Sequence, residues 1–136
     1  VEGGEVVYVD RVDGPSAGPY RDTHRVHPAL STASGRLLAA RAEDTAWQQA
    51  LALTDDPEQA EAVRSRADWA AAPWLAVAPS DPTLHPEVAV PVIDGRGNAV
   101  AALSAAVADP DAEGNKAVAA SLSRAARAAG RTLSHV

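Results

Sequence analysis

A run of small and hydroxyl-bearing residues directly precedes a stretch that is predicted to be a helix. The run is Ser31-Thr32-Ala33-Ser34-Gly35, and good helix formers cover 30–42. The first backbone N–H groups of a helix lack intrahelical partners and attract carboxylates and other hydrogen-bond acceptors. Small side chains would let a ligand approach these groups. Ordinary helix capping needs only one such hydroxyl, so capping and ligand binding both stay open as interpretations.

A second group of candidate residues lies on the clearest hairpin signal of the sequence. Apolar strands are predicted over 87–93 and 99–107, with a Gly-rich turn between them. Glu87 and Ala89 share one face of their strand, and the segment Ser104 to Ala106 should lie opposite them. A glutamate that faces an apolar pocket needs a partner, whereas a glutamate at the solvated end of a strand does not. Both environments are open for Glu87.

Motifs for catalysis or metal binding are missing from the sequence. Cys is absent, which excludes disulfides, thiolate metal sites and a Cys nucleophile. His24 and His27 are three residues apart, but Pro28 disfavours the helix that would bring them together for a metal. Neither a Gly-x-Ser-x-Gly elbow nor a phosphate-binding glycine motif occurs. We therefore expect no catalytic residues, no metal, no cofactor and no enzymatic activity.

Length and composition fit one acidic domain. The chain has 136 residues, a formal net charge of −6 and 46% hydrophobic residues. Duplex DNA is bound by Lys and Arg that neutralise phosphates, so this composition argues against direct DNA binding. The sequence has no apolar run of the ~18 residues that a membrane span requires and no signal-peptide pattern, which predicts a cytoplasmic protein. The first residue is Val, which favours an excerpt from a longer product.

The remaining patterns predict an α+β domain with an antiparallel sheet. A strand is expected over 5–12 and a short helix over 46–53. Asp55-Asp56-Pro57-Glu58 opens a further helix, whose face is continued by Ala60, Val63, Arg64 and Ala67. A strand interrupted by Pro73 is expected over 69–77, and a loop over 79–86. The final helix, over 112–133, carries an apolar stripe of Val118, Leu122, Ala126, Ala129 and Leu133.

Three segments, in this order, resemble the effector-binding domain of IclR-type transcription regulators. They are the opening strand Gly4 to Val12, the loop and helix Pro28 to Ala40, and the two strands Val88 to Ser104, with Pro-Val in the first and Ala-Leu-Ser ending the second. Val63-Arg64 and Trp69-Ala70 are similar to an Arg…Gly-Tyr-Ala element of the family. The resemblance covers nearly the whole chain. It departs at Ala67-Asp68, where the family usually has Gly, and at Glu87, where a Cys is frequent.

This resemblance implies a GAF-like fold, in which an antiparallel sheet is flanked by helices, as a single domain over residues 1–136. It also implies a pocket for a small effector, such as a carboxylate or an aromatic metabolite. Trp69 serves either as a wall of that pocket or as core packing. The ligand-binding residues so predicted are Ser31, Thr32, Ala33, Ser34, Gly35, Glu87, Ala89, Ser104, Ala106 and Trp69.

The family also implies partners outside this chain. A winged helix-turn-helix domain precedes the sensing domain in the family, is not present here, and would carry all contact with DNA. Self-association into a dimer or tetramer is a further implication. Two alternatives stay open. One is a degenerate member that serves as an oligomerisation module, and the other is a small hydrolase on an unrelated fold.

Overall fold

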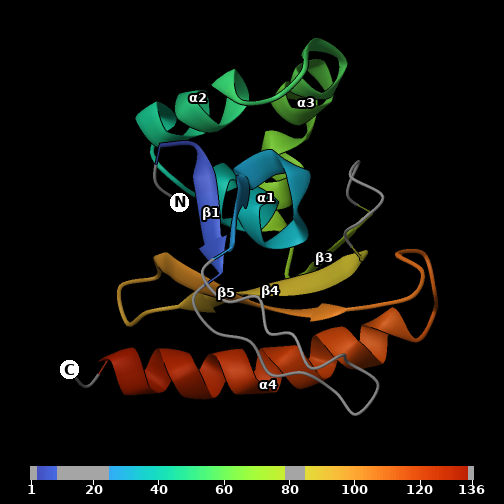
Figure 1. Ribbon diagram of the computed structural model, residues 1–136. Helices are drawn as coiled ribbons and strands as arrows, with labels where there is room; N and C mark the ends of the chain where they lie inside the picture. The colour runs from blue at the N-terminus through green and yellow to red at the C-terminus, as the bar shows by residue number, and fades with distance from the viewer. Residues whose placement is uncertain (1–2, 9–24, 79–84, 135–136) are drawn as a thin grey trace.

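The computed structural model describes residues 3–8, 25–78 and 85–134, so the predicted strand end at 9–12 and part of the predicted loop, 79–84, lie outside it. A three-stranded sheet lies between two helical layers (Figure 1). Helix α4 (Asn115–Ser134) covers one face, and α1 (Ala33–Ala40) covers the other. Helices α2 (Asp44–Ala52) and α3 (Asp56–Ala71) lie on the far side of α1 from the sheet. None of the described helices is long and apolar enough to cross a bilayer.

Both sheets are antiparallel, which confirms the predicted α+β class. The larger sheet has the order β3-β4-β5, formed by Leu75–Val77, Glu87–Ile93 and Ala99–Ala106. The smaller sheet pairs β1 (Glu5–Tyr8) with β2 (Arg25–Pro28). The predicted hairpin is therefore confirmed, and its strands have nearly the predicted bounds.

Strand β4 is buried on both faces because it lies in the central layer. Ala89 packs with Ala33 and Leu37 of α1, whereas Val90 and Val92 pack with Ala126 of α4. Alternating side chains of one strand thus contact opposite helical layers. A strand covered on both sides needs a continuous apolar sequence, and Val88 to Ile93 supplies one.

Helix α1 begins where the hydroxyl-rich run predicted a helix start. A short 3₁₀ turn, η1 (Ala29–Ser31), precedes it, and Thr32 is its N-cap. The Thr32 Oγ1 accepts a hydrogen bond of 2.9 Å from the backbone N–H of Gly35. Of the three hydroxyl residues considered for capping, Thr32 therefore performs it.

The predicted strand over 69–77 is wrong in its first half. Residues 69–71 are the last residues of α3, and β3 starts only at Leu75. The Ala-rich sequence continues the helix until the residue before Pro73, where the pyrrolidine ring disfavours helical backbone. Ala72 accordingly has extended dihedral angles, with φ −70° and ψ 133°.

Two predicted helix faces also need correction. On α3, Val63 is 61% exposed, and Ala62 is the buried apolar residue. On α4, which begins at Asn115 rather than at 112, Leu133 is 47% exposed, while Ala119 and Ala126 are buried. The predicted α4 stripe is correct in its centre, where Ala126 packs against β4, and wrong at its last residue.

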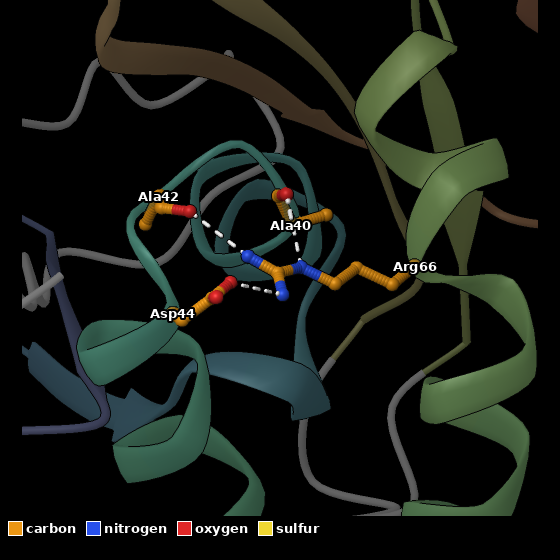
Figure 2. A network of polar contacts seen from close by, with 4 residues as sticks. All are labelled: Ala40, Ala42, Asp44 and Arg66. Atoms are coloured by element: carbon orange, nitrogen blue, oxygen red, sulfur yellow. Dashed lines mark hydrogen bonds and ion pairs between the residues drawn. The ribbon is translucent and has the colours of Figure 1, made fainter.

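Arg66, which lies outside the predicted face of α3, connects this helix to the other helices (Figure 2). Its guanidinium donates hydrogen bonds to the carbonyl oxygens of Ala40 and Ala42, at 3.4 and 3.0 Å, and to Asp44 Oδ1 at 2.9 Å. The same guanidinium lies 4.8 Å from the centroid of the Trp47 ring. One side chain therefore joins the end of α1, the start of α2 and the body of α3.

Candidate ligand site

The carboxylate of Glu87 lies against the first turn of α1. Its Oε1 accepts a hydrogen bond of 2.9 Å from the backbone N–H of Ser34. The Tyr8 hydroxyl donates to the same carboxylate, with its oxygen 3.0 Å from both Oε1 and Oε2. Three segments that are distant in sequence, the starts of α1 and β4 and the end of β1, thus meet at one carboxylate. Glu87 is partly buried there and accepts from Tyr8 and Ser34, so its environment differs from a solvated strand end.

The position of Glu87 is favourable because a helix N-terminus carries partial positive charge. The first N–H groups of α1 lack intrahelical partners, and the helix dipole adds to their field. Thr32 Oγ1 satisfies the N–H of Gly35, and Glu87 satisfies the N–H of Ser34. The chain's own groups therefore occupy two of the donors to which a ligand was predicted to bind.

The Ser34 hydroxyl is the exception in this cluster. Ser34 is 3% exposed, and its Oγ has no hydrogen-bond partner of acceptable geometry among the described residues. A buried hydroxyl without a partner costs free energy, so most such groups in folded proteins have one. The hydroxyl lies near the Tyr8 phenol, whose pKa it lowers through a side-chain hydrogen-bond contact of poorer geometry. It is a polar group with unused bonding capacity inside the site.

Burial raises the pKa of the Tyr8 phenol to about 12, and the negative charge of Glu87 acts in the same direction. Tyr8 consequently stays protonated at neutral pH and can serve as a donor to the carboxylate. Tyr8 was not among the site residues predicted from the sequence. The available signal was a phenol in an otherwise aliphatic strand, since a buried Tyr hydroxyl usually has a partner.

The Tyr8 pKa leads to a prediction for alkaline stability. In the unfolded chain Tyr8 ionises near the ordinary tyrosine pKa of 10.0, whereas the folded chain retains the proton up to a pKa of about 12. The stabilising contribution is therefore complete below pH 10 and is lost as the pH rises through about 12. We expect Tyr8 to account for up to roughly 2 kcal/mol of the lost unfolding free energy. Urea titrations over this pH range should show a smaller decline for Tyr8→Phe than for the wild type. An equal decline in both proteins would contradict the assignment.

The structure brings most of the predicted residues to the contact between α1 and β4. Ala33 and Ala89 pack in one fully buried cluster with Leu37. Ser104 is the register partner of Ala89, and Ala106 is the register partner of Glu87. Ala89 has no exposed surface, so it contributes core packing at this contact. The direct polar contact between the two groups is the one from Ser34 to Glu87.

Ser31 and Trp69 have other contacts. Ser31 Oγ donates to the Pro28 carbonyl at 2.7 Å. Trp69 packs against the cluster that contains Trp47, and the two rings are T-shaped at 6.3 Å. The Arg36 guanidinium lies 4.8 Å above Trp69, and its Nε donates to the Leu30 carbonyl. These contacts favour core packing as the function of Trp69.

The histidines, the possible metal ligands and an open groove are the remaining described features. His27 packs edge-on against Tyr8 at 5.7 Å, whereas His24 lies outside the described residues. The described part of the chain contains no group of three His, Asp or Glu side chains that could hold a metal. An open groove of about 470 Å³ runs between α4 and the end of β4. Its lining includes Ile93, Arg127 and Arg131 and none of the predicted ligand-binding residues.

The fold and the site together define an α+β domain in which one helix start is held against an antiparallel sheet. Solved structures with this fold include those of IclR-type transcription regulators, so the resemblance seen in the sequence is confirmed for the fold. No protein-family model matches the chain, and no curated protein matches it either.

Three of these solved structures illustrate the likeness. An IclR homologue from Microbacterium hydrocarbonoxydans, in complex with 4-hydroxybenzoate, has 21% identity and a TM-score of 0.82, over 100% of this chain and 59% of that one. An IclR regulator from Alicyclobacillus acidocaldarius has 18% identity and a TM-score of 0.70, over 98% and 58%. The C-terminal domain of KdgR from E. coli has 20% identity and a TM-score of 0.72, over 98% and 84%. The chain thus spans less than two thirds of the first two proteins.

Proposed function

We propose that this chain is the small-molecule-sensing domain of an IclR-type transcription regulator. In this proposal it binds a metabolite where α1 meets β4 and β5, and it changes the DNA binding of an attached winged helix-turn-helix domain. The likeness to regulators over the whole chain supports the proposal, as does the small aromatic ligand in one of them. The domain would be cytoplasmic, would act as a homo-oligomer and would have no enzymatic activity.

The observation that carries this proposal is the unpartnered Ser34 hydroxyl. A ligand that offers one acceptor or donor to Ser34 Oγ would recover a hydrogen bond that the free chain lacks. The hydroxyl belongs to the α1 layer, and the neighbouring carboxylate belongs to β4. A ligand bound there contacts two structural layers, so its binding can alter their spacing.

Substitution of Ser34 tests the site directly. We expect Ser34→Ala to leave stability unchanged or slightly higher, because it removes a buried hydroxyl without a partner. A compound found by thermal-shift screening of carboxylates, aromatics and amines should bind this variant roughly 2- to 10-fold more weakly, the effect of one hydrogen bond.

Ser31→Ala is the matched control, since the Ser31 hydroxyl already bonds to the Pro28 carbonyl. It should bind the same compound as the wild type does in calorimetric titration. If Ser34→Ala binds as tightly as the wild type, the ligand lies elsewhere, and the proposed site is wrong.

A second candidate function is an oligomerisation module whose site is closed. The observation that favours it is the Glu87 carboxylate, which already accepts from the Ser34 N–H at the start of α1. Sedimentation over a wide concentration range distinguishes the two functions when it is combined with the ligand screen. A module of this kind would self-associate while no compound in the screen raises its melting temperature.

A further inference from the structure

Glu87 has the position and the contacts that a bound anion has at a helix N-terminus. It accepts from a free backbone N–H of the first turn of α1 and from a protonated phenol. Anionic ligands are held by such N–H groups because the helix dipole favours negative charge there. Here the anion is the side-chain carboxylate of the first residue of β4, so it belongs to the chain itself.

A second anion beside the Glu87 carboxylate would be electrostatically unfavourable. Two carboxylates within a few ångströms repel each other, most strongly where burial reduces the screening by water. The two ion pairs found among the described side chains, Arg66–Asp44 and Lys116–Glu113, do not involve Glu87. A ligand carboxylate could thus reach the Ser34 N–H only by displacing the Glu87 side chain.

The Ser34 Oγ, which has no hydrogen-bond partner of good geometry, is a second polar group at the same place. It is buried beside the carboxylate that holds its own backbone N–H. A hydroxyl both donates and accepts, whereas an ionised carboxylate only accepts. The pair therefore suits a ligand group that donates to Glu87 while bonding to Ser34, such as an alcohol, an amide or an amine.

We propose that Glu87 is a specificity-determining residue whose carboxylate fills the anion position of the site, so that the domain admits uncharged or cationic polar ligands and excludes free carboxylates. This inference rests on the proposed function for its biological meaning. Its structural content, an internal carboxylate in an anion position, can be tested without knowledge of the effector.

Chemical rescue by acetate is the test. Glu87→Ala removes the carboxylate and leaves space for a small one, so acetate should stabilise this variant in a saturable manner. We expect acetate to bind Glu87→Ala at least about tenfold more tightly than the wild type, the effect of a charge-assisted hydrogen bond. Melting temperatures in acetate are compared with those in chloride at equal ionic strength, and with those in acetamide, which has a similar shape and no charge.

Two control variants separate the anion position from general effects. Glu87→Gln keeps the side-chain volume, so acetate should not rescue it. Glu113→Ala removes an equal charge from an exposed position, so acetate should affect it as it affects the wild type. If Glu87→Ala is unfolded in chloride, recovery of its circular dichroism in acetate supports the inference equally.

Several results would overturn the inference. One is that acetate does not stabilise Glu87→Ala more than chloride does. Another is that acetate stabilises the wild type as much as Glu87→Ala. The third is that acetamide stabilises Glu87→Ala as much as acetate does. Failure of the proposed function has a different signature, because acetate rescue would succeed while no compound raises the melting temperature of the wild type. That combination would mean that the Glu87 carboxylate permanently occupies the anion position of a site that binds no ligand.

Discussion

Replacing Gly35 by alanine is expected to lower the free energy of unfolding by roughly 3–5 kcal/mol, near the upper end for single substitutions. A Cβ at this position would lie 1.9 Å from the carbonyl oxygen of Ala29 and 2.7 Å from its Cα. These atoms belong to the backbone, so no side-chain rotation can relieve the overlap. Ala29 is fully buried, and its N–H donates to the Gly4 carbonyl at 2.9 Å.

Gly114→Ala is the matched control for this prediction. A Cβ there has no atom within 4 Å, and its backbone is not left-handed. The variant should be as stable as the wild type, or more stable by up to about 1 kcal/mol through reduced freedom of the unfolded chain. Urea denaturation of both variants gives the comparison. A Gly35→Ala protein as stable as the wild type would show that η1 and α1 are not packed as closely as described.

The Gly35 contact also shows a limit of prediction from sequence. The sequence placed Gly35 at a helix start and suggested a ligand as the reason for a small residue. The structure gives a packing reason, the close approach of η1. A sequence pattern shows that space is needed but does not show which atoms fill it.

The parts predicted well were those determined by local sequence. The β4–β5 hairpin follows from two apolar strands around a turn, and the start of α3 follows from an acidic, proline-containing opening. The face of α3 was mispredicted because its chemistry is mixed. Ala62 is buried in the cluster with Trp47, and Arg66 is partly buried against the Ala40 carbonyl, whereas Val63 is 61% exposed. Apolar periodicity cannot identify a face whose central contact is an arginine.

The proximity of the α1 start to Glu87 was predicted, but the contact itself was not. Tyr8 and Glu87 are 79 positions apart, and Ser34 and Glu87 are 53 apart. Strand periodicity placed Glu87 on the same face as Ala89, which does contact α1. The orientation of the carboxylate depends on the dipole of α1 and on Tyr8 from another sheet, and neither is encoded near Glu87 in the sequence.

Arg66→Ala is expected to lower the free energy of unfolding by roughly 2–4 kcal/mol, because hydrogen bonds to a charged group contribute more than neutral ones. The change leaves the carbonyls of Ala40 and Ala42, at the end of α1, without their guanidinium partner. Carbonyls at a helix end have no intrahelical donors, so the loss is not recovered within α1. It also removes the cation from the face of the Trp47 ring.

Two control variants assign this loss to the helix end rather than to the ion pair. The side chain of Asp44 is 90% exposed, against 26% for Arg66, so Asp44→Ala should cost less than about 1 kcal/mol. Arg64 is exposed on the same helix, and Arg64→Ala should stay within about 0.5 kcal/mol of the wild type. Urea denaturation of the three variants checks this order. A loss for Asp44→Ala as large as that for Arg66→Ala would mean that the ion pair, and not the contact with the end of α1, joins the three helices.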